Sequence, residues 1–431
     1  MKRLVRALIV TAIVTSSTLL AVPPGGTAQA VPGHTALVPQ TPRTDTPRVE
    51  ANEILDIETS GSRVYLAGTF TSIRDANGTS VSQRYLAAYD INTGRLDMGF
   101  RPTFDGSIAA VEASPDGTAL YIAGNFNTVN GVRRRKIARL NPTTGATVTA
   151  FTANANSRAT AIAVSSTTVY VGGFFSTVNG VSRGRLVGLN PANGAVDAMN
   201  LPITEGIGSG GVLKVMQLQL TSDDAALLVV HTGRRVAGLP HTGIALITTA
   251  TRSLRPWHTT LFDDNLARVG GVLRVTNGDI APNNQYFVVV SGSGGDRPPI
   301  NDTAMAFPMA GAAGVEPLWI SRHFDSVYSV AISEVAVYTG GHFRWQESPL
   351  ASDPWPGDAD ISYGWGNGLG AAVFGDEVVR RDTIGALDPA TGKALSWNPG
   401  ANPFEGVKAL ELTPRGLLIG QDGTMIGGRS V

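Results

Sequence analysis

The sequence of 431 residues contains no cysteine, so no disulfide bond stabilises the chain and no thiol serves as a nucleophile or a metal ligand. It also lacks an excess of charge of either sign, because 34 basic side chains balance 34 acidic ones. Nucleic-acid-binding proteins usually show a basic excess, and proteins that bind membrane surfaces usually carry a polybasic segment. We therefore expect neither kind of partner.

Charged residues are few, at 16%, and aromatic residues make up only 7% of the chain. Hydrophobic residues nevertheless reach 42%, and they recur in short runs throughout the sequence. This content is too apolar for a disordered chain. The 51 glycines and 25 prolines favour a turn-rich β protein over a helical one.

Long hydrophobic runs are absent after residue 30, where no segment approaches the ~18 uninterrupted apolar residues of a membrane span. The N-terminus has the pattern of a signal peptide, with Lys2 and Arg3 before an apolar stretch from Ala7 to Val22 and small residues at Ala28 and Ala30. A membrane anchor is the competing interpretation, but threonines and serines interrupt the stretch and a Pro-Pro-Gly-Gly run ends it. We predict cleavage after Ala30 and a secreted, extracellular or cell-wall-associated protein without a membrane span.

The chain contains an internal repeat with a period of about 50 residues. Each copy has a hydrophobic strand motif with paired small residues, and divergent copies fill the middle of the chain. A turn with Asn or Asp at its start and Gly at its end follows several of them. The strand motif occurs at Val64–Ile73, Leu120–Val129, Val169–Val178, Ala226–His231, Tyr286–Ser291, Val337–Phe343 and Gly416–Gly420, and the turn at Tyr89–Gly94, Leu140–Gly145, Leu189–Gly194 and Leu387–Gly392.

Each unit is predicted to hold four short strands bounded by Gly, Pro, Asn and Asp turns. Four strands in ~40–50 residues are typical of a β-propeller blade, and a closed ring protects the ends that an open stack would expose. We therefore predict an all-β fold, a single β-propeller domain over residues 31–431 with seven four-stranded blades; an open or six-bladed arrangement is the alternative. In the second unit the predicted strands are Ile108–Ala113, Ala119–Phe126, Lys136–Asn141 and Ala146–Phe151.

Two parts of the predicted ring are irregular. Only two strands fit after Glu405, so we expect the N-terminal segment around Thr35–Val38 to pair with the last blade as the closing strand. A long insertion, Arg344–Arg381, separates the second and third strands of the sixth blade. Long ordered insertions in compact domains are usually functional.

The Tyr-x-x-Gly-x-Phe strand followed by the Asn-Pro-x-x-Gly turn resembles the delta-60 repeats of secreted, actinobacterial-type β-propellers. The resemblance is specific over residues 60–200, recognisable over 335–425 and weak over 205–320. It implies the fold and export. Because that family has no established common activity, the resemblance implies no catalytic residue.

A ligand site is expected on one face of the ring, where the loops between blades meet the loops between second and third strands. The fifth and sixth blades bring most candidates there, and His323 with Asp325 has the composition of a ligand-binding or acid–base pair. The alternative is that these histidines are hydrogen-bonded structural residues. Trp345 of the insertion could stack on a sugar ring or cover the blade edge. The candidate ligand-binding residues are His323, Asp325, His342, Asp296, Arg297, Arg381, Asp382 and Trp345.

Calcium is the one cofactor for which the sequence offers candidate ligands. Asp353, Asp358 and Asp360 lie in a Pro/Gly-rich part of the insertion but lack the spacing of an EF-hand loop. No other cofactor is expected.

No catalytic signature accompanies the repeats. We therefore predict a monomeric, non-catalytic binding module that recognises a glycan or a cell-surface protein. One alternative is a hydrolase or lyase that acts on extracellular polysaccharide, which needs two suitably separated carboxylates at the propeller mouth. A structural component of the cell wall or coat is the second alternative.

Overall fold

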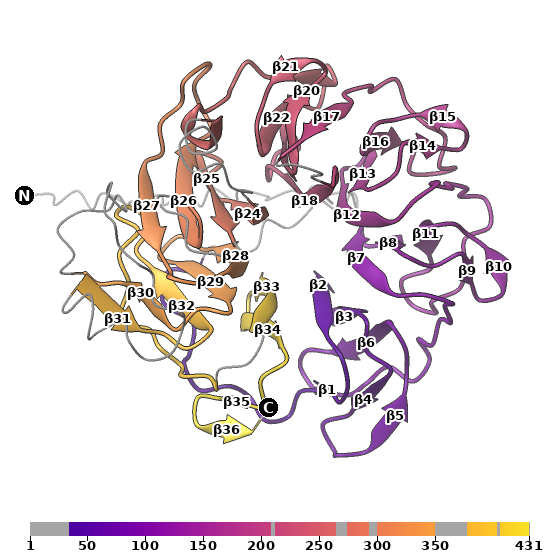
Figure 1. The fold of residues 1–431 in the computed structure, drawn as a ribbon. Coiled ribbons are helices and arrows are strands. Elements are labelled where there is room, and N and C mark those ends of the chain that lie inside the picture. Colours follow the sequence, from indigo (N-terminus) through magenta and orange to yellow (C-terminus); the bar gives the residue numbers. More distant parts are fainter. Residues whose placement is uncertain are drawn as a thin grey trace, which may run out of the picture.

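Seven small antiparallel sheets surround a central axis in the computed structural model, and the β-propeller prediction is confirmed (Figure 1). In each sheet the first strand lies next to the axis, and the first strands of neighbouring blades pack side by side around the ring. No helix in the described part of the chain is long and apolar enough to cross a membrane. The structure describes residues 34–207, 212–263, 274–292, 300–349, 377–402 and 406–430.

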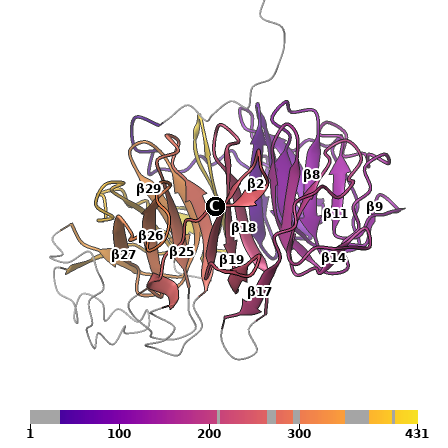
Figure 2. The ribbon, with the colours of Figure 1, turned by 90° about the horizontal axis from the view of Figure 1, so that it is seen from above.

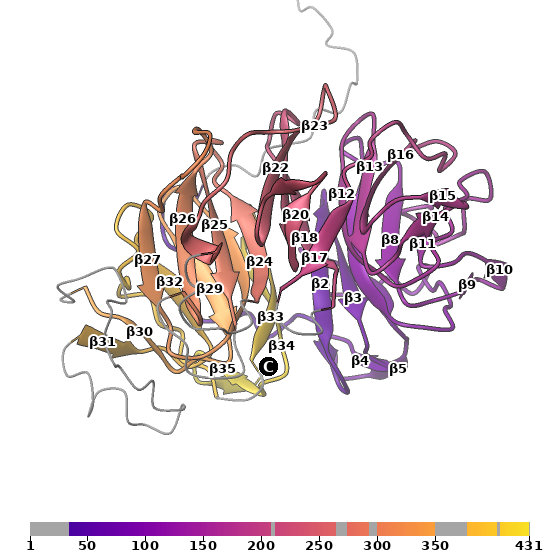
Figure 3. The same cartoon turned by 45° about the horizontal axis from the view of Figure 1, so that its top comes forward.

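The innermost strands line a central channel and run in the same direction (Figure 3). They begin at one face of the ring, here called the mouth face, which also carries the loops between blades. The opposite face carries the turns between third and fourth strands. The innermost strands are β2 (Ile54–Ser60), β7 (Ile108–Ala113), β12 (Ala159–Val164), β18 (Val215–Leu220), β24 (Val275–Ile280), β28 (Val327–Ile332) and β33 (Val407–Thr413).

The second and third strands complete the regular part of each blade. The second strands are β3 (Arg63–Gly68), β8 (Leu120–Gly124), β13 (Val169–Gly173), β19 (Ala226–His231), β25 (Tyr286–Ser291), β29 (Val337–Gly341) and β34 (Gly416–Gln421). The third strands are β6 (Leu86–Asp90), β11 (Ile137–Leu140), β16 (Leu186–Leu189), β22 (Ile244–Thr248), β26 (Thr303–Pro308) and β32 (Ile384–Leu387). Among the described residues, blade 7 pairs only β33 with β34.

The predicted fourth strands form fully only in blades 4 and 5, as β23 (Ser253–Leu254) and β27 (Trp319–Arg322). In blades 1, 2, 3 and 6 a single β-bridge stands in their place, such as Leu140↔Thr147 where Ala146–Phe151 was predicted. In blades 1 and 3 an aspartate just after the bridge turns the chain; for example, the Asp97 carboxylate accepts the backbone N–H of Gly99. A carboxylate that caps its own turn competes with continued strand pairing.

Short hairpins extend the connections between second and third strands, and Figure 2 shows them at the rim of the disc. Asn130 and Gly131 form the tip of one hairpin with φ angles of 50° and 74°, as the Asn-Gly motif predicts. The rim strands are β1 (Arg48–Val49) with β4 (Ser72–Arg74) and β5 (Ser80–Ser82), β9 (Thr128–Val129) with β10 (Val132–Arg133), β14 (Thr177–Val178) with β15 (Val181–Ser182), β17 (Ile203–Gly206) with β20 (Gly233–Val236) and β21 (Leu239–Pro240), β30 (Trp345–Glu347) with β31 (Val378–Arg380), and β35 (Met425–Ile426) with β36 (Arg429–Ser430).

The hydrophobic core consists of layers between adjacent blades, which explains the paired glycines of the repeat. A Cβ atom on Gly172 would collide with the Val215 side chain of the next blade, and one on Gly340 would collide with Val407. A Cβ on Gly173 would collide with the backbone oxygen of Arg158. The glycines therefore allow blades and strands to approach closely.

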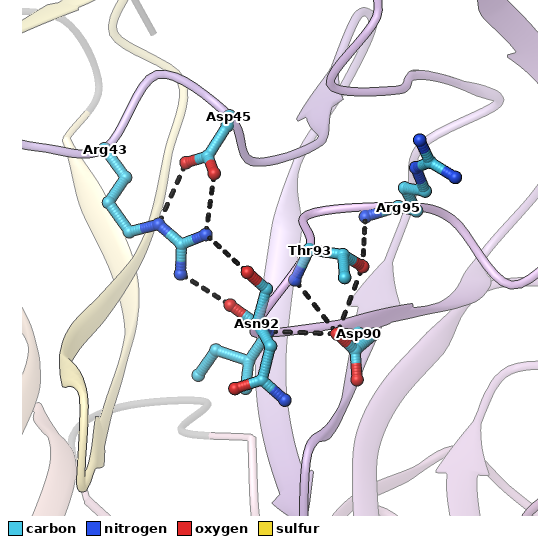
Figure 4. A network of polar contacts seen from close by, with 7 residues as sticks. Arg43, Asp45, Asp90, Asn92, Thr93 and Arg95 are labelled. Atoms are coloured by element: carbon cyan, nitrogen blue, oxygen red, sulfur yellow. Dashed lines mark hydrogen bonds and ion pairs between the residues drawn. The ribbon is translucent and has the colours of Figure 1, made fainter.

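Residues 34–45, here called the N-terminal strap, cross the outside of blade 7 and link blade 6 to blade 1. The backbone N–H of Val38 donates to the Tyr338 hydroxyl at 3.0 Å, and the Trp397 indole donates to the Val38 carbonyl at 2.8 Å. On blade 1 the Arg43 guanidinium donates to the carbonyl of Asn92 and pairs with Asp45 (Figure 4). The strap thus bridges the two blades that flank the incomplete one.

The strap lies where the closing strand was predicted but forms no strand over Thr35–Val38. Both backbone groups of Val38 bond to side chains instead of to a neighbouring strand. Pro39 and Pro42 also lack the N–H groups that a ladder requires. The ring closes by packing of β33 against β2, with the strap laid across the outside.

Candidate functional site

His323, the first residue of the predicted site, lies inside the protein and is fully buried. Its Nε2 atom is 2.9 Å from the Thr339 hydroxyl, its Nδ1 atom is 3.2 Å from the Ser321 carbonyl, and its ring packs edge-on against Phe343. Burial lowers the pKa of His323 to about 3, so the imidazole is neutral at ordinary pH. These contacts match the alternative of a hydrogen-bonded structural histidine.

Asp325 and His342 do come together near the surface. The Asp325 carboxylate lies 3.5 Å from the His342 Nδ1 atom, and about half of the His342 side chain is exposed. The carboxylate also accepts the backbone N–H of Ser326 at 2.7 Å. This pair is the part of the predicted site that remains accessible to a ligand.

Arg381 occupies a position that recurs in the repeat. Its guanidinium donates to the carbonyls of Arg380 and Leu395 and thereby ties the rim hairpin to the end of the blade. Arg134 in blade 2 and Arg183 in blade 3 make the same two kinds of contact. Burial lowers the pKa of Arg381. The guanidinium is therefore engaged in a contact that belongs to the blade architecture.

The other predicted residues divide between the rim and the undescribed part of the chain. Trp345 is buried against Phe324 and Val378, so it covers the blade edge. Asp382 accepts a hydrogen bond from Arg380 at 3.0 Å. Outside the described residues lie Asp296, Arg297, Asp353, Asp358 and Asp360.

No group of three or more histidine, aspartate or glutamate side chains within the described ranges is arranged to hold a metal ion. Calcium binding by the insertion stays a prediction, because its three aspartates fall outside those ranges.

The central channel is a cavity with a volume of about 1390 Å³. Side chains from the innermost strands of all seven blades line it. Four carboxylates lie at one level, because each is the fifth residue of its innermost strand and the strands pack in the same register around the ring. They are Glu58, Glu112, Asp279 and Glu411.

The channel carboxylates repel one another in a confined space. Burial raises the pKa of Glu58, Glu112 and Glu411, and the neighbouring carboxylates raise it further. Burial also raises the pKa of Asp56, two residues before Glu58, to about 7 and that of Asp279 to about 6. Several of these groups are therefore protonated in the folded protein at mildly acidic pH.

Three of these carboxylates also join adjacent blades through the backbone, and among them Glu58 on β2 accepts the N–H of Ala113 on β7 at 3.1 Å. Asp56 on β2 accepts the N–H of Val111 on β7 at 2.8 Å, and Asp279 on β24 accepts the N–H of Ile332 on β28 at 2.8 Å. The channel lining thus contributes both to blade packing and to the surface that a ligand would meet.

The channel carboxylates were missed from the sequence, although a signal was present. When the repeats are aligned on their strand motifs, an acidic residue recurs at one position of the first strand in four of the seven units. Acidic side chains are not expected in the middle of a buried strand unless they line a cavity or have partners. That recurrence predicts a polar channel once the ring is assumed.

Known proteins resemble this chain in fold. A family model described as a β-propeller domain of unknown function (DUF5122) matches residues 115–146 and 168–198, which belong to blades 2 and 3. The structure of U3-55K is similar with a TM-score of 0.50 and 12% identity over 88% of this chain and 92% of that one. The WD40 repeats of RRP9 give a TM-score of 0.45 and 13% identity over 71% of this chain and 80% of that one. No curated protein matches the sequence.

Proposed function

We propose that the chain is a secreted, non-catalytic binding module that recognises a glycan or a protein at the cell surface or outside the cell, with the ligand held at the central channel. The observation behind the proposal is the size of the channel. Typical ligand pockets measure ~300–1,000 Å³, and the channel, at about 1390 Å³, has room for a ligand of that class or a larger one. The β-propeller fold is compatible with this role. Export rests on the signal-peptide pattern of the N-terminus.

The polar lining favours a ligand rich in hydroxyl or amide groups. Gln217 and Gln219 line the channel with their amide groups. An amide offers donors and acceptors together, which suits hydroxyl groups that do both. The channel carboxylates add strong acceptors.

A second candidate function is hydrolysis of an extracellular polysaccharide within the channel. The observation that favours it is the set of raised carboxyl pKa values, because glycosidases pair a protonated carboxyl acid with an ionised carboxylate. Conversion of a bound oligosaccharide to shorter products would distinguish this function from simple binding.

The test is a variant that fills the channel without disturbing the blades. Ala109 lines the cavity on β7, and an Ala109→Trp substitution should obstruct it. Val181, an exposed residue of the β14–β15 hairpin, provides the matched control Val181→Trp. Screening of the mature protein against arrays of glycans and of surface proteins should identify binders. We expect Ala109→Trp to abolish their binding and Val181→Trp to retain it; equal binding by both variants would rule out the channel.

A further inference from the structure

Three cationic residues occupy one position of the repeat in three consecutive blades. Arg158, Lys214 and Arg274 each come directly before an innermost strand, at the start of β12, β18 and β24. Because these strands begin at the mouth face and pack side by side, the three residues form an arc on that face. Lys214 and Arg274 line the channel, and Arg158 contacts the same Phe174 ring as Lys214. We call this set the cationic arc.

Two members of the cationic arc contact one aromatic ring, and the charge of the third acts on Lys214. The Arg158 guanidinium lies 4.2 Å from the centre of the Phe174 ring, and the Lys214 Nζ atom lies 5.3 Å from the same centre. Burial lowers the pKa of Lys214, and the charges of Arg158 and Arg274 lower it further. The lysine is thus held where additional negative charge would stabilise it.

No carboxylate within the described part of the chain forms an ion pair with any member of the arc. Elsewhere on the same face Lys408 pairs with Glu53. Like charges without counter-ions raise the free energy of the folded chain unless a ligand compensates them. The closeness of these like charges therefore favours an anion as ligand.

The charge changes sign along the channel. From the cationic arc to the level of the four carboxylates is five residues of strand, or about 16 Å. A ligand with phosphates along its whole length, such as a nucleic acid, would be repelled at the carboxylate level, and the net charge of +0 does not attract one. A ligand with an anionic group at one position and hydroxyl groups beyond it fits both levels.

We propose that the cationic arc of Arg158, Lys214 and Arg274 binds the carboxylate or sulfate group of an acidic glycan, whose uncharged part lies in the channel. This inference rests on the proposed binding function and specifies its ligand class. Gln217 lies between the arc and the level of the carboxylates, and Gln219 lies at that level, where both amides would meet sugar hydroxyls. An acidic peptide is less suitable, because an extended backbone supplies fewer hydroxyl groups for this lining.

The test compares acidic sugars with their uncharged counterparts on the mature protein. One arm uses trigalacturonate and its methyl ester, the other a sulfated trisaccharide and its desulfated form, which separates carboxylate from sulfate recognition. In at least one arm we expect the acidic form to bind about tenfold more tightly at low salt and to lose this advantage at high salt.

Substitutions locate the effect. Lys214→Met and Arg274→Gln should each weaken binding of the acidic form about tenfold and leave the uncharged form unaffected, because each removes one charge-assisted contact. Arg95→Gln provides the control, since Arg95 is exposed on the opposite face. This substitution changes the net charge by the same amount as the other two. Unchanged melting temperatures would show that the variants fold.

The outcomes separate this inference from the proposed function. Equal binding of acidic and uncharged sugars, or an equal effect of Arg95→Gln, overturns the cationic arc and leaves glycan binding in place. Tighter binding of oligoglutamate or of oligothymidylate than of either acidic sugar overturns the ligand class. Failure of the mature protein to bind any of these sugars overturns the inference, and the proposed function then depends on a protein ligand.

Discussion

Equivalent tyrosines of blades 2 and 6 each form a hydrogen bond to a backbone group at the next junction. At the junction of blades 2 and 3 the backbone group belongs to the next blade, and at the junction of blades 6 and 7 it belongs to the strap. In the first, the Tyr121 hydroxyl of blade 2 donates to the Pro191 carbonyl in the turn of blade 3 at 2.8 Å. In the second, the equivalent Tyr338 of blade 6 meets the backbone N–H of Val38 from the strap. The strap therefore makes, on blade 6, the contact that the turn of blade 3 makes on blade 2.

The difference lies in how far apart the partners are in sequence. Tyr121 and Pro191 are separated by 70 residues, whereas Val38 and Tyr338 are separated by 300. The regular contact forms when two successive units have folded, but the strap contact requires the N-terminal segment to meet the sixth blade. Closure of a longer loop costs more conformational entropy, so the strap contact is the one expected to open first.

Removal of the strap should have the largest effect on stability, because it eliminates the contact that distinguishes the two junctions. Deletion of residues 34–42 exposes the surface that covers Val38 and removes its bonds to Tyr338 and Trp397. Burial of one valine and two hydrogen bonds together contribute about 3–5 kcal/mol. We expect the melting temperature, measured by calorimetry, to fall by roughly 5 °C or more.

Two controls accompany the deletion. Leu37→Ala alters an exposed side chain of the same strap and should change the melting temperature little. A peptide of residues 31–45 added in trans should restore part of the lost stability in proportion to its concentration. Melting of the truncated chain at the temperature of the full chain would show that packing of β33 on β2 closes the ring without the strap.

A smaller effect comes from two tryptophans that make matching bonds at the two kinds of junction. The Trp319 indole donates to the Pro389 carbonyl in the turn of blade 6 at 2.8 Å, and the Trp397 indole donates to the Val38 carbonyl of the strap at 2.8 Å. Replacement of either by phenylalanine should cost about 1–3 kcal/mol, because a buried carbonyl loses its donor.

The effect of the Trp397 substitution on stability should depend on the strap, whereas the effect of the Trp319 substitution should not. In the chain without residues 34–42, Trp397→Phe should cost almost nothing further, while Trp319→Phe should keep its full cost. Chemical denaturation of the parent, the truncated chain and the two tryptophan variants with and without the strap would provide two double-mutant cycles. Equal costs of Trp397→Phe with and without the strap would mean that the indole stabilises blade 6 alone.

The regular blades could be predicted from the sequence because their signals are local. The Asn-Gly tip at Asn130 and the paired glycines at Gly172 and Gly173 depend on turns and close contacts that each unit repeats. The strap could not be predicted in its true form. Its bonds join Val38 to side chains about 300 residues away, and only the three-dimensional ring shows that the prolines around Val38 meet blade 7 from outside.

The candidate site was harder to predict, for a physical reason. His323 and Asp325 are near neighbours in sequence, but the chain reverses at Phe324, which has a φ of 61°, so one side chain is buried and the other reaches the surface. The channel carboxylates and the cationic arc are instead far apart in sequence and meet only because the units share a register. Their signal is a residue type that recurs at a repeat position, not a local motif.

The smallest expected effect concerns the carboxylates that face each other across the closing junction. Glu411 on β33 lies near Glu58 and Asp56 on β2, Glu112 on β7 and Asp279 on β24, and Thr59 donates a hydrogen bond to it at 3.3 Å. Burial and these neighbours raise its pKa in the folded state. A raised carboxyl pKa means that the folded protein holds more protons than the unfolded chain, so stability falls as pH rises from about 4 toward 8.

Glu411→Gln keeps the oxygen that accepts the Thr59 hydrogen bond and removes the charge. At pH 8 the variant should melt about a degree or two above the parent, because the repulsion across the closing junction is gone. At pH 4, below the ordinary pKa of a glutamate, the raised pKa keeps the parent carboxyl protonated, and the two should melt together. Glu316→Gln is the control, since Glu316 is exposed, and it should leave the melting temperature at both pH values unchanged.

A lower melting temperature of Glu411→Gln at both pH values would contradict this prediction. It would mean that an ionised Glu411 stabilises the ring. The channel carboxylates would then hold the first and last blades together instead of pushing them apart.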